Sequence, residues 1–186
     1  MRSESPFSKR ERAGARRRAR EFCVALLYAS DSGLDGPAAV FMQADDMLTS
    51  LFTEWGLAPD EAQKLRPAVS DFGRRLCEEY FIHHRDIDER IDRLSQGWTL
   101  ERMPVVDRNI LRMAMAELLY LADIPVGATI DEAVDLAKEY GTADSGKFIN
   151  GILGTVAREL QTPPAAADEA PTPEEESPPE PLAEAD

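Results

Sequence analysis

The chain has 186 residues, 43% of them hydrophobic, and a formal net charge of −14. This length suits one ordinary domain with flanking tails, and so acidic a surface excludes nucleic-acid binding over most of its area. No stretch approaches the 18 or so apolar residues of a membrane span and no signal-peptide pattern opens the chain, so we expect a cytoplasmic protein without a membrane partner.

The N-terminal segment is basic although the chain as a whole is acidic. Residues 1–20 hold eight basic and two acidic side chains. We expect residues 1–14 to form a disordered basic arm, and a helix to follow over about residues 16–30. Four arginines stand where that helix is expected to begin, namely Arg16, Arg17, Arg18 and Arg20.

The position of these arginines needs an explanation. A helix N-terminus carries partial positive charge, so each cation there is unfavourable by about 0.3–1 kcal/mol. An anionic partner would offset this, and a nucleic-acid backbone is the first candidate. Two alternatives remain from the residues alone: a solvated arm that balances the acidic body, or arginines that pair with an acidic protein.

The segments that follow also have helical periodicity. Apolar side chains recur at three- and four-residue spacing, and no segment shows the sustained alternation of a strand. This pattern predicts helices over about residues 37–52, 60–65, 67–94, 106–121, 129–140 and 145–160. Together with the first helix, they predict an all-α domain of about six to seven helices over residues 15–161.

Particular residues mark the ends of these helices. Pro67 is expected to open a helix, because proline is tolerated in a first turn. Thr129 and Glu132 are expected to form a capping box. Gly141 is expected to end that helix in the left-handed conformation, and Ser145 to cap the last helix.

The end of the chain has the opposite character to its beginning. Residues 162–186 hold eight acidic and no basic side chains, together with seven prolines. Such a composition cannot bury enough apolar surface to offset the entropy of ordering, so we expect a disordered acidic tail. The tail either masks the basic arm electrostatically or serves only to keep the protein soluble.

No constellation of catalytic side chains is found in the sequence. The segment Gly141–Lys147 fits the G-x-x-x-x-G-K core of a phosphate-binding loop, but Phe148 replaces the Ser or Thr hydroxyl, and a helix precedes the segment in place of a strand. His83 and His84 are adjacent and point in different directions on a helix, so they make no metal site without further ligands. We therefore expect no enzyme, no cofactor, no metal and no small-molecule substrate.

Three blocks of the chain together resemble the NusB family of transcription antitermination factors. The first is RRRARE at Arg16–Glu21, which runs into ALLY at Ala25–Tyr28. The second is VDRNILRMAMAEL at Val106–Leu118, similar to the family's central helix. The third is IDEAVDLAKEYG at Ile130–Gly141, followed by DSGKFINGIL at Asp144–Leu153, and it is similar to the family's C-terminal signature.

The resemblance implies a fold of two packed three-helix groups and a role in transcription. It implies that the protein binds single-stranded boxA RNA of nascent ribosomal RNA transcripts together with NusE, a protein of the small ribosomal subunit. With other Nus factors, this complex would join RNA polymerase and suppress premature termination.

The resemblance also implies which residues form the site. It implies RNA contacts for Arg16, Arg17, Arg18, Arg20, Tyr28, Lys147 and Phe148, and NusE contacts for Asp107 and Asp144. A basic surface with aromatic side chains suits single-stranded RNA. Tyr28 and Phe148 also fit apolar helical faces, and Asp144 also fits a helix N-cap.

Two other functions are compatible with the sequence. One is a NusB-like accessory module related to ribosomal RNA methyltransferases, although the chain shows no methyl-donor-binding domain. The other is a helical scaffold that binds only protein. RNA binding that weakens steeply with salt would favour the antitermination factor over the scaffold.

Overall fold

The computed structural model describes residues 9–33, 36–95 and 97–161. Within these residues it is built from helices alone, which confirms the predicted all-α class. The helices are α1 (Lys9–Asp31), α2 (Gly36–Met42), α3 (Ala44–Glu54), α4 (Pro59–Leu94), α5 (Val105–Tyr120), α6 (Val126–Tyr140) and α7 (Ser145–Gln161), with a short 3₁₀ turn at Leu100–Arg102. In the part described, no helix is both long and apolar enough to span a membrane.

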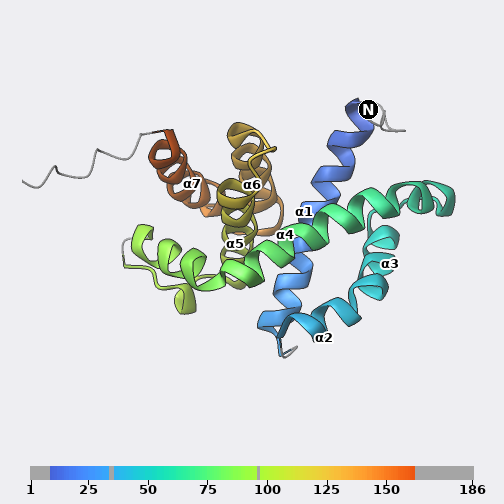
Figure 1. Ribbon diagram of the computed structural model, residues 1–186, viewed down its shortest axis with the longest axis horizontal. Helices are drawn as coiled ribbons and strands as arrows, with labels where there is room; N and C mark the ends of the chain where they lie inside the picture. The colour runs from blue at the N-terminus through green and yellow to red at the C-terminus, as the bar shows by residue number, and fades with distance from the viewer. Residues whose placement is uncertain (1–8, 34–35, 96, 162–186) are drawn as a thin grey trace, which may run out of the picture.

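The long helix α4 organises the molecule because it runs through both halves of it (Figure 1). α2 and α3 lie beside its N-terminal part, whereas α5, α6 and α7 lie toward its C-terminal part. α1 crosses α4 and also packs against α5, so it joins the two helix groups. One hydrophobic core runs through both groups, and its largest fully buried side chains are Phe22, Leu26, Leu27, Leu48, Leu76, Ile87, Ile91, Ile110, Leu111, Met113, Met115 and Leu121.

α1 and α4 approach each other most tightly at a glycine. A Cβ atom at Gly73 would lie 2.6 Å from Cδ1 of Phe22 and 2.8 Å from the carbonyl oxygen of Ala19. Only a residue without a side chain allows this approach without displacing the α1 backbone. The same core holds Cys23 and Cys77 as buried free thiols, and burial, with the adjoining Cys77 thiol, raises the pKa of Cys23.

α1 begins at Lys9, well before the predicted start at Arg16. The segment KRERA is rich in strong helix formers, and Nζ of Lys64 on α4 lies 2.8 Å from Oε1 of Glu11. The arginine cluster therefore lies inside the helix, and the predicted penalty for cations at a helix N-terminus does not apply to it. The expected basic arm is helical from its ninth residue, whereas its first eight residues and the acidic tail lie outside the described residues.

The single helix predicted over residues 37–52 is two helices. The backbone leaves helical geometry between α2 and α3 at Gln43 (φ −96°, ψ −1°). This break lets both short helices bury a side chain, Val40 from α2 and Leu48 from α3. Burial of one such aliphatic side chain contributes about 1.5–3 kcal/mol, enough to outweigh the lost helical hydrogen bonding at one residue.

The helices predicted over residues 60–65 and 67–94 are instead one continuous helix, with Pro67 inside α4. Proline removes one backbone hydrogen bond, that to the carbonyl of Gln63. Gln63 is exposed, so water can donate to that carbonyl and the helix continues. The residue of α4 with non-helical backbone angles is His83 (φ −110°, ψ 15°).

The predicted capping box of Thr129 and Glu132 is not formed. α6 begins at Val126, directly after Pro125, so Thr129 lies within the first turn. Its side chain is buried, and the hydroxyl donates a hydrogen bond to the carboxylate of Glu117 on α5. Thr129 therefore connects two helices and does not cap one.

Gly141 ends α6 in an extended conformation (φ −97°, ψ −160°), not in the predicted left-handed one. Glycine is required here for space, because a Cβ atom would lie 2.6 Å from the carbonyl oxygen of Ala137 and 2.6 Å from Cβ of Ser145. Ser145 begins α7, and its hydroxyl accepts a hydrogen bond from the Thr142 amide (2.8 Å) and donates one to Asp107 (2.8 Å). This turn fixes the start of α7 against α5.

Candidate nucleic-acid interface

The arginines of α1 fall into an inward pair and an outward pair. Arg20 belongs to the inward pair and is only 3% exposed. Its Nε donates to Oε2 of Glu117 (2.8 Å), its Nη2 donates to the other carboxylate oxygen, and Thr129 donates to the same carboxylate. This buried cluster joins α1, α5 and α6. Arg20, predicted to contact RNA, is therefore engaged inside the protein, where it holds α1 in place.

Arg17 is also directed toward acidic side chains. Its Nε lies 2.8 Å from Glu21, its Nη2 lies 2.6 Å from Glu139 and its Nη1 lies 3.5 Å from Glu132. Burial opposes the charge, but the hydrogen bond to Glu21 and the three carboxylates raise the pKa of Arg17. Arg17 therefore connects α1 to α6, and its charge is largely neutralised by protein.

Arg16 and Arg18 form the outward pair. The Arg16 guanidinium lies 5.4 Å from the centroid of the Phe72 ring, and that of Arg18 lies 5.5 Å from the Trp55 ring. Within the described residues, neither has a carboxylate within ion-pairing distance. A cation over an aromatic face gains about 0.5–1 kcal/mol when exposed, and the edge of the guanidinium remains available to an anion.

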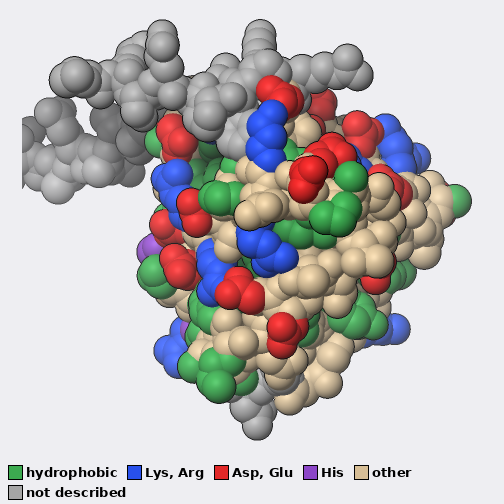
Figure 2. Space-filling model, turned by 90° about the vertical axis from the view of Figure 1, so that its right-hand side faces the viewer, with side chains coloured by type: hydrophobic (Ala, Val, Ile, Leu, Met, Phe, Trp, Pro, Cys, Tyr) green, Lys and Arg blue, Asp and Glu red, His purple; other side chains and the backbone are tan. Residues whose placement is uncertain are grey.

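The surroundings of this pair are mixed in charge. Figure 2, which views the side of the molecule where α3 and the beginning of α4 lie, shows basic side chains scattered among acidic and hydrophobic ones. The overall field of the chain is negative, so a phosphate would be attracted only at short range. Cations without a carboxylate partner therefore matter more than the total number of cations.

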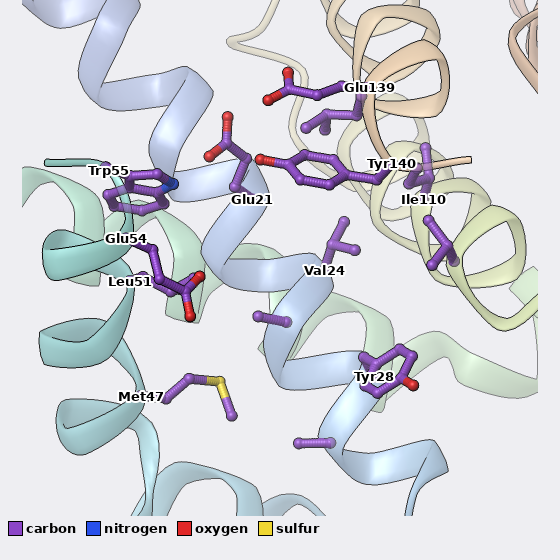
Figure 3. A pocket seen from close by; sticks show the side chains of 14 residues that line it. Glu21, Val24, Tyr28, Met47, Leu51, Glu54, Trp55, Ile110, Glu139 and Tyr140 are labelled. Atoms are coloured by element: carbon purple, nitrogen blue, oxygen red, sulfur yellow. The ribbon is translucent and has the colours of Figure 1, made fainter. Parts of the chain in front are cut away.

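Tyr28 lies further along α1 and is 48% exposed. It lines a groove of about 740 Å³ between α1, α3, α5 and α6 (Figure 3). In this view Trp55, which directly follows α3, and Tyr140 of α6 lie on opposite sides of α1, with Glu21 between them and Val24 below. The floor of the groove is apolar, with contributions from Met47, Leu51, Ile110 and Leu136.

The rim of this groove is acidic. Glu21, Glu54 and Glu139 line it, and burial together with the charges of Glu21 and Glu139 raises the pKa of Tyr140 to about 12. An apolar floor with carboxylates at the edge suits a protein segment better than a phosphate backbone. Tyr28 therefore shares a helix with the outward arginines but opens onto a surface of different chemistry.

The remaining predicted residues meet at the turn between α6 and α7. A second cavity, of about 420 Å³, is lined by Asp107, Asp144, Phe148 and Trp98 among others. Phe148 packs against Trp98, with ring centroids 6.2 Å apart and ring planes inclined by 51°. Lys147 is exposed and lines an adjoining hollow with Asp144 and Phe148. The structure thus brings together residues predicted for RNA and residues predicted for NusE.

Trp98 was missed by the sequence reasoning, although it is 54% exposed. It follows α4 in the segment between α4 and the 3₁₀ turn, where the helical pattern is broken. A large aromatic residue in such a break is the only sequence signal for it. None of the four predicted arginines lines the cavity beside Trp98.

Asp107 has an incomplete set of hydrogen bonds. It is 4% exposed, its Oδ2 accepts the Ser145 hydroxyl, and its buried Oδ1 has no partner. Burial raises the pKa of Asp107, although the Ser145 hydrogen bond acts in the opposite direction. A contact between Asp107 and any partner would have to be made through the cavity that it lines.

The other residues considered for chemistry pack against neighbouring side chains or form turns. His83 stacks on Tyr120 with ring centroids 3.7 Å apart, and its Nε2 lies 3.7 Å from Glu79. Across the described ranges, no three His, Cys, Asp or Glu side chains are grouped as metal ligands would be. The segment Gly141–Lys147 follows a helix, α6. A phosphate-binding loop follows a strand, so this segment is not one.

The sequence of the chain is similar to that of known proteins of one family. Its residues 17–158 match the NusB family. A relative from Heliobacterium modesticaldum, "Transcription antitermination protein NusB", is 41% identical over 147 residues, which are 79% of this chain and 64% of the relative. The chain therefore spans slightly less than two thirds of that curated relative. The relative's name is that of a transcription factor, not of an enzyme.

Two solved structures extend the similarity to the fold. NusB of T. maritima is 37% identical, with a TM-score of 0.62 over 77% of this chain and 91% of that chain. A structure of antitermination factors NusB and NusE in complex with double-stranded RNA is 27% identical, with a TM-score of 0.55 over 82% of this chain and 99% of that chain. The sequence match and the shared helical architecture agree, and this chain belongs to the NusB family.

Proposed function

We propose that this protein is a transcription antitermination factor that binds boxA RNA of nascent ribosomal RNA transcripts together with NusE. Family membership supports the antitermination role, and the NusB relative solved with NusE and double-stranded RNA supports NusE and RNA in general as partners. RNA polymerase, with other Nus factors, is the assembly in which the complex would act to prevent premature termination.

The observation that carries the RNA part of this proposal is the outward pair on α1. Arg16 and Arg18 are the members of the arginine cluster that stack on aromatic rings without an ion-pair partner among the described residues. In so acidic a chain, such cations are the preferred place for a phosphate backbone. Arg17 and Arg20 support this surface indirectly, because their contacts with Glu139 and Glu117 fix the position of α1 against α6 and α5.

The aromatic and acidic residues have separate proposed roles. Tyr28, Phe148 and Lys147 extend the RNA surface, with the rings available to stacked bases and the lysine to a phosphate. Asp144 is exposed and contacts NusE. Asp107 supports that contact indirectly, because it binds Ser145 and so holds the turn that carries Asp144.

A titration of a short boxA-type RNA, with and without NusE, tests this proposal. The variants are the Arg16→Gln/Arg18→Gln double mutant and the control double mutant Arg85→Gln/Arg93→Gln, which removes the same charge from exposed positions on the second half of α4. We expect NusE to strengthen binding, the α1 variant to lose most of it, and the control to retain it.

The same titration separates the alternatives. Equal loss in both double mutants would mean a general charge effect and would contradict an RNA site on α1. If NusE binds but no RNA binds at any salt concentration, the protein-only scaffold becomes the better description. A methyl-transfer assay on ribosomal RNA with the chain added to a methyltransferase tests the accessory-module alternative.

A further inference from the structure

A third arginine has the same environment as the outward pair, but it lies on a different helix. The guanidinium of Arg66 on α4 lies 5.2 Å from the centroid of the Phe52 ring on α3. Its Nη2 donates to the Thr49 hydroxyl (2.8 Å). Among the described residues, no carboxylate lies within ion-pairing distance of Arg66. The sequence analysis did not single out this residue.

Arg66 is joined to Arg18 by aromatic contacts. The rings of Phe52 and Trp55 meet edge to face, with centroids 5.6 Å apart and planes inclined by 64°. Arg18 stacks on Trp55 and Arg66 on Phe52. We call the set Arg18, Trp55, Phe52 and Arg66 the arginine row. It runs from α1 across α3 to α4.

The two cations of the arginine row are close enough to serve one strand. The separations along the row are 5.5 Å, 5.6 Å and 5.2 Å, so the two guanidinium groups are at most about 16 Å apart. Stacking on a ring restricts each guanidinium before any ligand arrives, which reduces the entropy lost when a phosphate is bound.

Neighbouring arginines on α4 differ from Arg66 because they have carboxylate partners. Arg74 stacks on Phe41, but its Nη2 lies 3.2 Å from Asp45. Arg75 lies 3.2 Å from Asp123. Both of these charges are compensated within the protein, whereas the described residues offer Arg66 no carboxylate partner.

We propose that the arginine row is a track for the RNA backbone, which continues the site on α1 across α3 and places a phosphate on Arg66. This inference rests on the proposed function and extends it to RNA beyond the segment held by α1. A backbone of phosphates fits better than an acidic protein, because it presents single charges at regular intervals along a narrow path. The acidic neighbourhood also favours a narrow path, since Glu61 lines the same cavity as Arg18.

The test compares Arg66→Gln with Arg85→Gln in the full-length chain. Arg85 is exposed and lies about 28 Å further along α4, well beyond the Debye length at 0.1 M salt. The logarithm of the affinity for a boxA-type RNA extended by single-stranded nucleotides on both sides is measured against the logarithm of the salt concentration. One phosphate contact to a single strand contributes about 0.7 to this slope, which is about fivefold in affinity between 1 M and 0.1 M salt.

We expect Arg66→Gln to reduce the slope by about 0.7 and to weaken binding about fivefold at 0.1 M salt, whereas Arg85→Gln leaves both unchanged. An unchanged slope in Arg66→Gln, or an equal reduction in Arg85→Gln, would overturn the proposal. If Arg16→Gln/Arg18→Gln abolishes binding while Arg66→Gln has no effect, the track is wrong but the site on α1 stands. If neither variant alters binding, the proposed RNA site itself is wrong.

A third variant separates charge from packing, because Arg66 covers Phe52. Arg66→Lys keeps the charge and an apolar stem over the ring. We expect it to keep the wild-type salt slope. If Arg66→Lys loses the slope as Arg66→Gln does, and both unfold at a lower temperature, Arg66 is a packing residue and the proposal is overturned.

Discussion

α1 presents four arginines within five positions, and the inward and outward pairs have opposite environments. In the inward pair, Arg20 is enclosed with Glu117 and Thr129, and Arg17 contacts three glutamates. In the outward pair, Arg16 and Arg18 lie over aromatic rings and have no carboxylate partner among the described residues.

The difference follows from the partners that each side chain reaches. Arg16 and Arg20 are about 40° apart on the helix and both lie over Phe72, but Arg20 also reaches the carboxylate of Glu117. Successive residues are rotated by about 100°, so neighbouring arginines meet different parts of the protein. Chemical identity alone therefore says little about role. The inward pair fixes the position of α1 against α5 and α6. This position determines which arginines remain accessible to a ligand.

Loss of the counter-charge of Arg20, in the inward pair, should have the largest effect on stability. Glu117→Gln leaves the buried Arg20 charge without a counter-charge, and we expect a loss of about 3–5 kcal/mol in the free energy of unfolding. Urea denaturation followed by circular dichroism measures it. A double mutant, Arg20→Met/Glu117→Leu, should recover most of the loss, because apolar replacements of buried ion pairs are often neutral. A loss below about 1 kcal/mol in Glu117→Gln would mean that the cluster does not seat α1.

The crossing of α1 and α4 should give the next largest effect. Gly73→Ala places a methyl group where Phe22 and the Ala19 carbonyl already lie, and we expect a loss of about 1–3 kcal/mol. Gly151→Ala is the matched control, because it lies within α7 with open space around it. That change should stabilise the protein by about 0.5–1 kcal/mol. Equal effects of the two changes in thermal melts would contradict the tight crossing.

Single substitutions on α1 test the contrast between the inward and outward pairs. Arg18→Gln should reduce the salt slope of RNA binding by about 0.7 and weaken binding about fivefold at 0.1 M salt, with little change in stability. Arg17→Gln should do the reverse, with the slope unchanged and a stability loss of about 0.5–1 kcal/mol. Fluorescence anisotropy and urea denaturation on the same preparations measure both. If the two variants behave alike, the division of the α1 arginines into an inward and an outward pair is wrong.

An effect on stability of similar size to that of Arg17→Gln is expected at the C-terminal end of α1, and it depends on pH. Burial of Asp31 is opposed and outweighed by Arg108 and Arg112, which lower its pKa below the ordinary 3.8. The ion pairs therefore stabilise the fold above the unfolded-state pKa, and this contribution is lost as the pH falls through the folded-state pKa. Asp31→Asn should cost about 1 kcal/mol at pH 7 and nearly nothing below the folded-state pKa, as measured by urea denaturation against pH.

Asp107→Asn serves as the control of opposite sign. Because burial raises the pKa of Asp107, its contribution to stability is complete below 3.8 and is lost as the pH rises through the folded-state pKa. The variant should therefore gain stability relative to the wild type as the pH rises above 3.8 through the folded-state pKa of Asp107, whereas Asp31→Asn loses stability as the pH rises toward 3.8. Parallel curves for the two variants would show that their carboxylates do not differ in environment.

Sequence reasoning found the elements whose signals are local. α5 was predicted over residues 106–121 and spans Val105–Tyr120, because its apolar periodicity is strong and prolines stand on both sides. The start of α1 and the continuity of α4 at Pro67 were missed. The start of α1 rests on the contact between Lys64 and Glu11 as well as on local helix propensity, and the continuity of α4 rests on the solvation of an exposed carbonyl.

The sequence predicted the residue types of the site but not which of them contact one another. The arginine cluster itself is visible in the sequence, and the recurrence of Ala15, Ala19 and Phe22 marks the buried face that draws in Arg20. The partner of Arg20, Glu117, is 97 positions away in the sequence, and the rings below Arg18 and Arg66 come from another helix. Such long-range pairs leave no signal in a single sequence.

The non-helical backbone angles at His83 also affect the direction of the N-terminal part of α4. The segment from Pro59 to His83 is about 36 Å long at 1.5 Å per residue, and the helix groups lie toward opposite ends of α4. A change of 10° at His83 would swing the Pro59 end by about 6 Å, and Arg66 on the same arm by about 4 Å. The position of the RNA track relative to the α5–α7 group thus depends on the backbone angles at His83 and on α1, which joins the two helix groups.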